Sequence, residues 1–495
     1  MLHYPRSMTE LQHAAKATRP RIQPAEEGDR RPLSVSARLG RLQFHQSGKF
    51  RVLQFADIQD GPKVSKDTIS LIEASLDATR PDLVIFNGNQ IAGYDSAYAL
   101  TSRKRRWDAR PASASSEASG ERYAAALEHT RELVRATIEQ LVHPLADRGV
   151  PWAVTFGNHD FQCGLDNDEI ESICREFPGC INPERAADGT TGIAVKHGVK
   201  HDVGDMEQDF GLPEQPVIAC APGTFALSVT DVDRTYDVLG LVLLDSGDYA
   251  RSGGYGSPSE AALRFLADAP GLMAAQSQQL QQDRQDDEQD SPREPRKTPS
   301  TLPCMVFQHF PIEQYYRLLK PVAATAARAI EGYRNFAGRH FVLNEDKTQP
   351  GSYLGEGVSC PDADSGEFAI LDKAGYFAIS AGHDHRNAFV GSVPVGTDGD
   401  RQMMMVASPT SGFGSYGPVP AKRAARLFEF DIRHPYEPRT QLLEYDELVG
   451  KPSAGKAYAY GMTSESKPDS EGMDLLHRPT WWSKTWNKLV SLFRR

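Results

Sequence analysis

The chain has 495 residues, of which 39% are hydrophobic and 24% are charged, and its 66 acidic and 55 basic residues give a net charge of −11. It contains no run of the roughly 18–20 uncharged apolar residues that a membrane-spanning helix requires, which excludes an integral helical membrane protein. The acidic net charge argues against a nucleic-acid-binding protein, so no nucleic-acid partner is expected.

Residues 1–45 are polar and show no sustained periodicity, so a disordered N-terminal arm is expected there. Its basic residues are not followed by an apolar stretch, and no secretory signal is predicted. Cys163, Cys174 and Cys180 lie close together in the sequence; reduced, partly buried thiols are the favoured interpretation, and a metal or disulfide cluster is the alternative. The expected compartment is the cytoplasm.

Apolar runs and helical periodicity alternate over the next hundred residues. Residues 50–56, 83–86 and 152–156 are short apolar runs typical of buried strands. Between them, apolar residues recur at helical spacing over 69–76 and over about 121–147. The resulting β-α-β-α-β order predicts a mostly parallel sheet with crossover helices.

Later apolar runs are more typical of a sheet meander. They fall at residues 225–230, 238–244, 304–307, 376–380, 402–407 and 427–432. Two layers of strands flanked by helices would use all of them, so the expected fold is α/β, a four-layer α/β/β/α sandwich of two mixed sheets. This main domain is expected over 46–447, with a low-complexity, disordered insert at 276–300.

The C-terminal end is predicted to consist of a polar linker at 448–474 and an amphipathic helix at 475–495. One broad face of that helix carries three aromatic residues, Trp481, Trp482 and Trp486. Because lysine and arginine flank this face, two interpretations stay open: the helix docks on the protein, or residues 481–495 contact a membrane surface peripherally.

Polar side chains follow the apolar runs at the points where the strands are expected to end. They are Asp57, Asn89, Asn158, His309, His383 and His385. Ligands bind at that edge of α/β sheets, because the loops converge there while the strands fix their geometry. Nitrogen and oxygen donors that converge from several strands suit Zn, Mn or Fe, and a thiolate site is not predicted.

In this order, the motifs resemble those of the calcineurin-like metallophosphoesterase superfamily, whose usual pattern is D-x-H, G-D-x, G-N-H-[DE], a lone H and G-H-x-H. The matching segments here are Asp57-Ile58-Gln59, Gly88-Asn89-Gln90, Gly157-Asn158-His159-Asp160, His309 and Gly382-His383-Asp384-His385. The resemblance covers about residues 48–432. The runs at 243–247 and 412–417 are similar to the purple-acid-phosphatase-like branch.

The resemblance implies a catalytic domain in which two divalent ions, Mn, Fe or Zn, hold a hydroxide for in-line attack on a small phosphorylated substrate. The positions that match metal ligands are Asp57, Gln59, Asn89, Asn158, His309, His383 and His385. His159 would be the catalytic residue that stabilises the phosphoryl group or protonates the leaving oxygen. Asp160 either orients His159 or is a turn residue.

Two positions depart from the family pattern. Gln59 stands where a histidine is usual, and Asn89 stands where the bridging aspartate is usual. Amide oxygens can ligate metals but are neutral, so Asp57 is the only anionic residue among the matching positions, and two dications would repel each other more strongly. Asp60 either lends a carboxylate or caps the turn at 61–62.

Two functions therefore stay open at this point. The first is a metal-dependent phosphoric ester hydrolase, a phosphatase or phosphodiesterase. The second is a catalytically weak or inactive protein of the same fold that binds a metal or a phosphorylated ligand.

Overall fold

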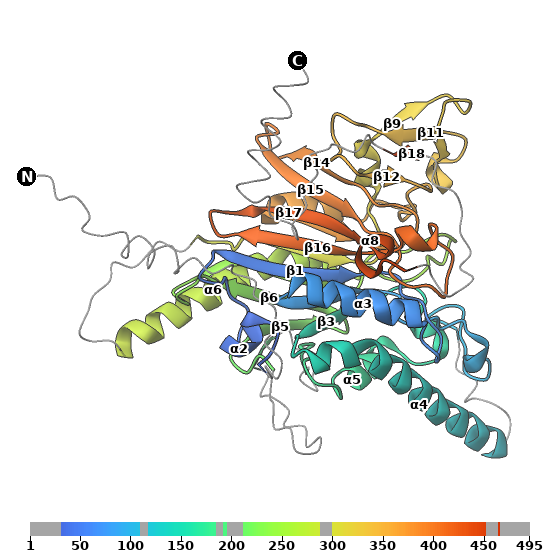
Figure 1. Ribbon diagram of the computed structural model, residues 1–495, viewed down its shortest axis with the longest axis horizontal. Coiled ribbons are helices and arrows are strands. Elements are labelled where there is room, and N and C mark those ends of the chain that lie inside the picture. Colours follow the sequence, from blue (N-terminus) through green and yellow to red (C-terminus); the bar gives the residue numbers. More distant parts are fainter. Residues whose placement is uncertain are drawn as a thin grey trace, which may run out of the picture.

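The computed structural model describes residues 31–108, 117–184, 192–195, 211–287, 299–451 and 464–465. Two large sheets lie against each other with helices on their outer faces (Figure 1). Among the described helices, none is long and apolar enough to cross a bilayer. The helix predicted at 475–495 and most of the linker before it lie outside the described residues.

The first sheet has five strands in the order β17-β16-β1-β2-β3. Their bounds are Lys49–Phe55 (β1), Leu83–Asn87 (β2), Trp152–Thr155 (β3), Ala424–Asp431 (β16) and His434–Glu444 (β17). Strands β1, β2 and β3 are parallel, and helices α3 (Lys66–Thr79) and α4 (Glu117–Asp147) connect them, which confirms the predicted β-α-β-α-β unit.

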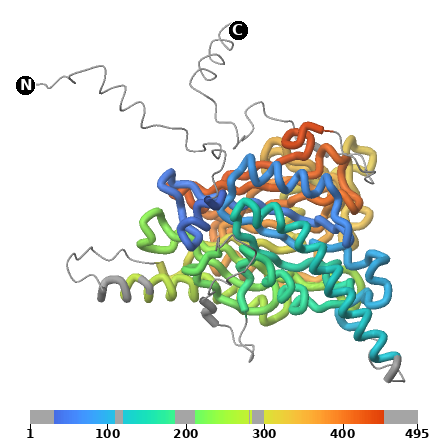
Figure 2. Tube along the Cα trace, turned by 60° about the horizontal axis from the view of Figure 1, so that its bottom comes forward, coloured from blue at the N-terminus to red at the C-terminus, as the bar shows by residue number. Residues whose placement is uncertain are grey.

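The C-terminal part of the domain completes this sheet. Strand β16 pairs antiparallel with β1, with Val52 opposite Phe428, and β17 pairs antiparallel with β16. Figure 2 shows the outcome, with the blue N-terminal segment beside the red C-terminal strands.

The second sheet has eight strands in the order β14-β15-β13-β8-β7-β6-β5-β4. Their bounds are Gly192–Val195 (β4), Pro216–Ala221 (β5), Thr224–Thr230 (β6), Asp237–Leu244 (β7), Cys304–Gln308 (β8), Tyr376–Ala381 (β13), Val390–Val395 (β14) and Arg401–Ala407 (β15). Strands β7, β8, β13 and β15 are parallel, whereas the outer strands are antiparallel. Both sheets are therefore mixed.

Alternation along each strand sorts the apolar side chains into three layers of core. On β1, Phe50 and Val52 belong to the cluster between the two sheets, together with side chains such as Phe307 of β8. Leu53 and Phe55 of the same strand belong instead to the cluster under α3 and α4. A third cluster packs under α6 (Glu260–Asp287) and α7 (Glu367–Ala374). This is the predicted four-layer α/β/β/α sandwich.

Smaller elements complete the domain. They are α2 (Val35–Leu39), α5 (Asn167–Cys174), α8 (Tyr445–Val449), β9 (Leu319–Val322), β10 (Ile330–Glu331), β11 (His340–Leu343), β12 (Tyr353–Leu354) and β18 (Ser464–Glu465). Strands β9, β10 and β11 form a separate small sheet. Cys163, Cys174 and Cys180 are buried in the core under α4, as expected for core thiols.

The predicted N-terminal arm is too long. Helix α2 lies inside it, and Leu42 and Phe44 are completely buried against the second sheet. The buried Asp82 carboxylate fastens this segment, because it accepts hydrogen bonds from Ser36 and lies 2.7 Å from Nε2 of His45. Two apolar side chains in a polar stretch were too weak a signal to predict this packing. Residues 1–30 lie outside the described part.

The predicted disordered insert at 276–300 begins too early. Helix α6 continues through this composition as far as Asp287, and residues 288–298 lie outside the described part of the chain. Glutamine and arginine are favourable residues inside a helix, so low sequence complexity alone did not mark the end of α6.

Candidate active site

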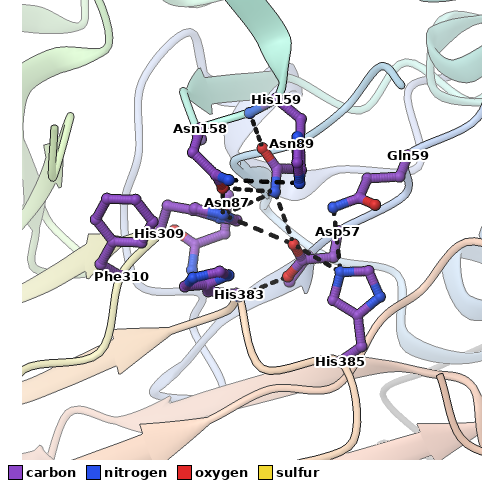
Figure 3. Close-up of polar contacts among 12 residues, drawn as sticks. Asp57, Gln59, Asn87, Asn89, Asn158, His159, His309, Phe310, His383 and His385 are labelled. Carbon is purple, nitrogen blue, oxygen red and sulfur yellow. Dashed lines mark hydrogen bonds and ion pairs between the residues drawn. The ribbon is translucent and has the colours of Figure 1, made fainter. Parts of the chain in front are cut away.

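The predicted site residues converge from five strands that belong to both sheets. Asp57 and Gln59 follow β1, Asn89 follows β2, and Asn158 and His159 follow β3. From the second sheet, His309 follows β8, and His383 and His385 follow β13. Figure 3 shows their side chains pointing toward one another. The ring centres of His309 and His383 lie 5.1 Å apart, so the spatial convergence expected from the sequence is present.

Glycines in the motifs allow this close approach of the loops. A Cβ atom at Gly157 would lie 2.2 Å from Oδ1 of Asn89, and one at Gly382 would lie 2.8 Å from Oδ2 of Asp57. Any larger residue at these positions would push the two polar side chains out of place.

Left-handed backbone conformations are concentrated at the same place. Among the described residues, eight that are not glycine have positive φ, and four of them are site residues: Asp57, Gln59, Asn89 and His383. Such conformations cost energy and persist only where the surroundings fix them. Here the backbone N–H of His383 donates to Oδ2 of Asp57 at 2.6 Å, which fixes the turn after β13.

The side-chain amide of Asn89 lies at the centre of the site in a defined orientation. Its Oδ1 accepts a hydrogen bond from the backbone N–H of His159 at 2.8 Å. A backbone N–H can only donate, so the oxygen must face it and the NH₂ group must face the other way. That nitrogen lies 2.8 Å from Nε2 of His309, 3.1 Å from Oδ1 of Asp57 and 3.2 Å from Oδ1 of Asn158.

The surrounding imidazoles turn their Nε2 atoms toward the site. Nδ1 of His309 lies 3.1 Å from the carbonyl oxygen of Asn87, and Nδ1 of His385 lies 2.7 Å from that of Tyr416. A carbonyl oxygen only accepts, so each Nδ1 carries a hydrogen. Burial lowers the pKa of His309, so its inward Nε2 presents a lone pair at neutral pH. Acceptor atoms therefore converge on the Asn89 nitrogen.

Gln59 also turns its amide nitrogen inward. Nε2 of Gln59 lies 3.1 Å from Nε2 of His385, and its Oε1 accepts a hydrogen bond from the Tyr94 hydroxyl at 3.1 Å. Asn89 thus presents a hydrogen-bond donor where the pattern has a metal ligand, whereas both partners of Gln59 can donate or accept and do not by themselves fix its amide.

Burial and neighbouring charges set the ionisation of the site. Burial opposes ionisation of Asp57, but the imidazoles of His309 and His385 outweigh it and hold the pKa of this carboxyl well below its usual range. Burial lowers the pKa values of His309 and His383, and it lowers that of His159 to about 4. Burial also opposes protonation of His385, but the neighbouring Asp57 carboxylate outweighs it and raises the pKa of this imidazole.

Asp160 fixes the loops and does not contact His159. Its carboxylate accepts hydrogen bonds from four backbone N–H groups, those of Gly157, Asn89, Gln90 and Ile91. Nδ1 of His159 lies instead 2.7 Å from Oε1 of Gln162. Of the two predicted roles for Asp160, the turn residue is correct, and Gln162 is the residue that orients His159.

Asp60 does not reach the site. Its Oδ2 accepts from the backbone N–H of Ser65 at 3.0 Å and from the Thr68 hydroxyl at 2.7 Å, so it organises the start of α3. The sequence interpretation that gave Asp60 a local structural role is the better one, although the element it supports is the helix rather than the turn at 61–62.

Tyrosines that the sequence did not single out line the site. Tyr416 stacks on His385 with ring centres 4.2 Å apart, and the hydroxyl of Tyr249 accepts a hydrogen bond from Nδ2 of Asn158 at 2.8 Å. Tyr94 packs edge-on against His159. Tyr416 lies in the run at 412–417 that supported the branch resemblance, but no pattern in the sequence gave any of the three tyrosines a role in the site.

These residues do not fit a pair of metal ions. A bridging ligand must offer lone pairs to both ions, whereas Asn89 offers N–H groups, and only Asp57 supplies negative charge. Among the described residues, no group of three or more His, Cys, Asp and Glu side chains is arranged to hold a metal ion. Three of the positions that match metal ligands keep donors of the right kind, namely Asn158, His309 and His383, and Nε2 of His383 is buried without a hydrogen-bond partner beside His309.

Comparison with known proteins agrees with the motifs. A family model described as calcineurin-like phosphoesterase matches residues 50–218, and purple-acid-phosphatase-like relatives match most of the chain. These matches support the calcineurin-like phosphoesterase superfamily and its purple-acid-phosphatase-like branch. Members of this superfamily typically bind divalent metals and act on phosphorylated substrates. Gln59 and Asn89 depart from the motifs that bind those metals, so these two positions bear most directly on the function of this chain.

The individual relatives are distant in sequence. "Probable inactive purple acid phosphatase 29" of Arabidopsis thaliana is 19% identical, over 93% of this chain and 92% of that protein. "Probable inactive purple acid phosphatase 28" of the same plant is 22% identical, over 78% and 77%. Phosphatase DCR2 of Saccharomyces cerevisiae is 21% identical, over 72% of this chain and 47% of that protein. The solved structure of GAP50, the anchor in the inner membrane complex of Plasmodium, matches with a TM-score of 0.32 and 10% identity, over 85% of this chain and 90% of that one.

Proposed function

We propose that this chain binds phosphoric esters at the edge of its two sheets and hydrolyses them weakly or not at all. The proposal depends on one observation: the NH₂ group of Asn89 occupies the point on which Asp57, Asn158 and His309 converge. A dinuclear phosphoesterase needs cations at that place to generate hydroxide and to stabilise the transferring phosphoryl group.

Asp57 and His159 are poor general bases. The carboxyl of Asp57 has a strongly lowered pKa, and His159 has a pKa of about 4, so neither group would take a proton from water efficiently near neutral pH. Attack by water assisted by either of them would therefore lack both a metal and a base of suitable strength. The names of two plant relatives, which call those proteins probably inactive, are in keeping with this proposal.

A second candidate function is hydrolysis with a single ion. It is favoured by the unpartnered Nε2 of the buried His383, which lies near two further neutral donors, Nε2 of His309 and Oδ1 of Asn158. One divalent ion held by these three groups would supply Lewis-acid chemistry. The yeast relative named as a phosphatase is in keeping with this alternative.

Three measurements on the full chain separate these functions. The chain is incubated with Mn²⁺ or Zn²⁺ and dialysed, and the bound metal is counted by elemental analysis. Hydrolysis of an aryl phosphate and of an aryl phosphodiester is followed in Mn²⁺, and binding of phenylphosphonate, which cannot be hydrolysed, is followed by calorimetry. We expect less than one ion per chain, binding of phenylphosphonate and no turnover above that of His309→Ala.

Two other results contradict the proposal. Two ions per chain with turnover that His309→Ala abolishes would establish the dinuclear hydrolase that the family resemblance implied. One ion per chain with such turnover would establish the single-ion alternative.

A further inference from the structure

A run of four basic residues at 103–106 lies beside the site, and two of them are paired with carboxylates. Arg103 contacts the Asp166 carboxylate at 2.5 Å, and Arg106 makes two hydrogen bonds to Asp245 at 2.9 and 3.1 Å. The guanidinium of Arg105 has no carboxylate partner within the described residues. Its NH1 donates to the carbonyl oxygen of Lys104 at 2.9 Å, so further N–H groups remain available.

Aromatic rings hold Arg105 next to the site. Its guanidinium carbon lies 3.7 Å from the centre of the Tyr249 ring, which is a favourable cation–π position. The hydroxyl of Tyr249 accepts from Nδ2 of Asn158 at 2.8 Å, so the cation stands one ring away from a predicted ligand residue. Tyr249 in turn stacks on Tyr255, whose ring packs edge-on against His383.

The charges of the site favour a cation such as Arg105 near a bound phosphate. In a dinuclear phosphoesterase two dications neutralise the bound phosphate. Here amides stand at two of the positions that match metal ligands, and the Asp57 carboxylate lies among them, so a bound phosphate would lack the charge of two dications unless a nearby cation supplied it.

We infer that Arg105 is the residue that recognises the phosphate group, and that the ligands of this site are phosphate monoesters. This inference rests on the proposed function. A planar guanidinium forms paired, charge-assisted hydrogen bonds with two oxygens of one phosphate. A monoester dianion offers three terminal oxygens and a second negative charge, whereas a diester offers two oxygens and one charge, so the monoester gains more from the same arginine.

The test compares three variants of the full chain. Arg105→Gln removes the charge, Arg105→Lys keeps the charge but loses the paired geometry, and the neighbouring exposed Lys104→Gln is the matched control. Affinities for phenylphosphonate, a monoester analogue, and for its monomethyl ester, a diester analogue, are measured by calorimetry at two salt concentrations. Melting temperatures check that each variant is folded.

We expect Arg105→Gln to weaken phenylphosphonate binding about 10- to 100-fold, the loss that corresponds to a charge-assisted pair. Arg105→Lys should lose less affinity for phenylphosphonate, and Lys104→Gln should change that affinity less than about twofold. In the wild type, the monomethyl ester should bind more weakly than phenylphosphonate. If wild type binds phenylphosphonate and both Arg105 variants bind it equally well, the inference is wrong while the proposed function stands. If wild type binds neither probe, the proposed function fails, and the inference fails with it.

Discussion

The side-chain nitrogen of Asn89 lies 2.8 Å from Nε2 of His309, so a hydrogen-bond donor faces the lone pair of the imidazole. In a metal-binding site that lone pair would be directed at a cation. The NH₂ group satisfies His309 and Asp57 together, because it carries two hydrogens and both acceptors lie within 3.1 Å. Around Asn89, the polar atoms of the site are thus compensated by the chain itself.

Asn89→Asp should convert this group of mutually hydrogen-bonded side chains into a metal-binding site. One carboxylate oxygen would keep the hydrogen bond from the backbone N–H of His159, and the other would face Asp57 and the lone pair of His309. Without a cation these groups repel one another. We expect Mn²⁺ affinity to rise at least tenfold and the melting temperature in EDTA to fall, as measured by calorimetry and thermal unfolding with and without metal. Unchanged affinity would mean that position 89 does not face the metal.

A double variant tests whether the two departures explain a loss of activity. Gln59→His combined with Asn89→Asp restores the family pattern at both positions. We expect the double variant to bind two Mn²⁺ ions and to hydrolyse an aryl phosphate at a rate above that of wild type, since both ions would then have an imidazole or carboxylate ligand in place of an amide. The same double change with His309→Ala added is the control, and it should return the rate to background. A double variant with two bound ions but no turnover would place the defect elsewhere in the site.

Gly382→Ala tests the close contact that brings Asp57 under the turn after β13. The added Cβ would lie 2.8 Å from Oδ2 of Asp57, so backbone or carboxylate must move, and we expect the free energy of unfolding to fall by about 1–3 kcal/mol. Gly271 in α6 is the matched control, because a Cβ there meets nothing within 4 Å; Gly271→Ala should raise stability by up to about 1 kcal/mol. Urea unfolding of both variants measures the difference. Equal changes in the free energy of unfolding at the two positions would contradict the close contact between Gly382 and Asp57.

The sequence could predict where the site residues lie but not how their amides point. Asp57 and His309 each follow a buried apolar run, and runs of this kind in a layered α/β fold end at a common edge. The orientation of the Asn89 amide depends on the backbone N–H of His159, which arrives from a different loop. Such a contact exists only after the chain has folded, and for the same reason the sequence did not identify Gln162 as the partner of His159.

The packing of the N-terminal segment against the second sheet could not be predicted from the sequence for a related reason. Leu42 and Phe44 stand alone among polar neighbours, and no periodicity marks them. They are buried because an existing sheet surface accepts them, and the Asp82 carboxylate binds the same segment through Ser36 and His45. Tertiary contacts, rather than local pattern, decide the structure here.

Glu429 on β16 should make stability depend on acid pH. The side chain is 1% exposed and contacts Arg51 at 2.8 Å and Lys49 at 3.0 Å. Burial opposes its ionisation, but hydrogen bonds and charge from these two residues outweigh it, so the pKa of Glu429 in the folded chain is lowered. Its stabilisation is therefore complete above the unfolded-state pKa of about 4.3 and is lost as the pH falls through the lower folded-state value.

Glu429→Gln removes the carboxylate that Arg51 contacts, whereas Lys49 keeps a second carboxylate partner, Asp431, at 2.9 Å. At pH 7 we expect the free energy of unfolding to fall by about 2–4 kcal/mol, because an uncompensated charge then stays buried. The difference from wild type should narrow below about pH 4, where the wild-type carboxyl becomes protonated too. Glu260 is the control, since it is 92% exposed and meets Arg264 only at 3.5 Å; Glu260→Gln should change stability by less than about 0.5 kcal/mol. Urea unfolding from pH 3 to pH 8 measures both variants, and a Glu429→Gln effect that does not vary with pH would show that lost packing, not charge, is responsible.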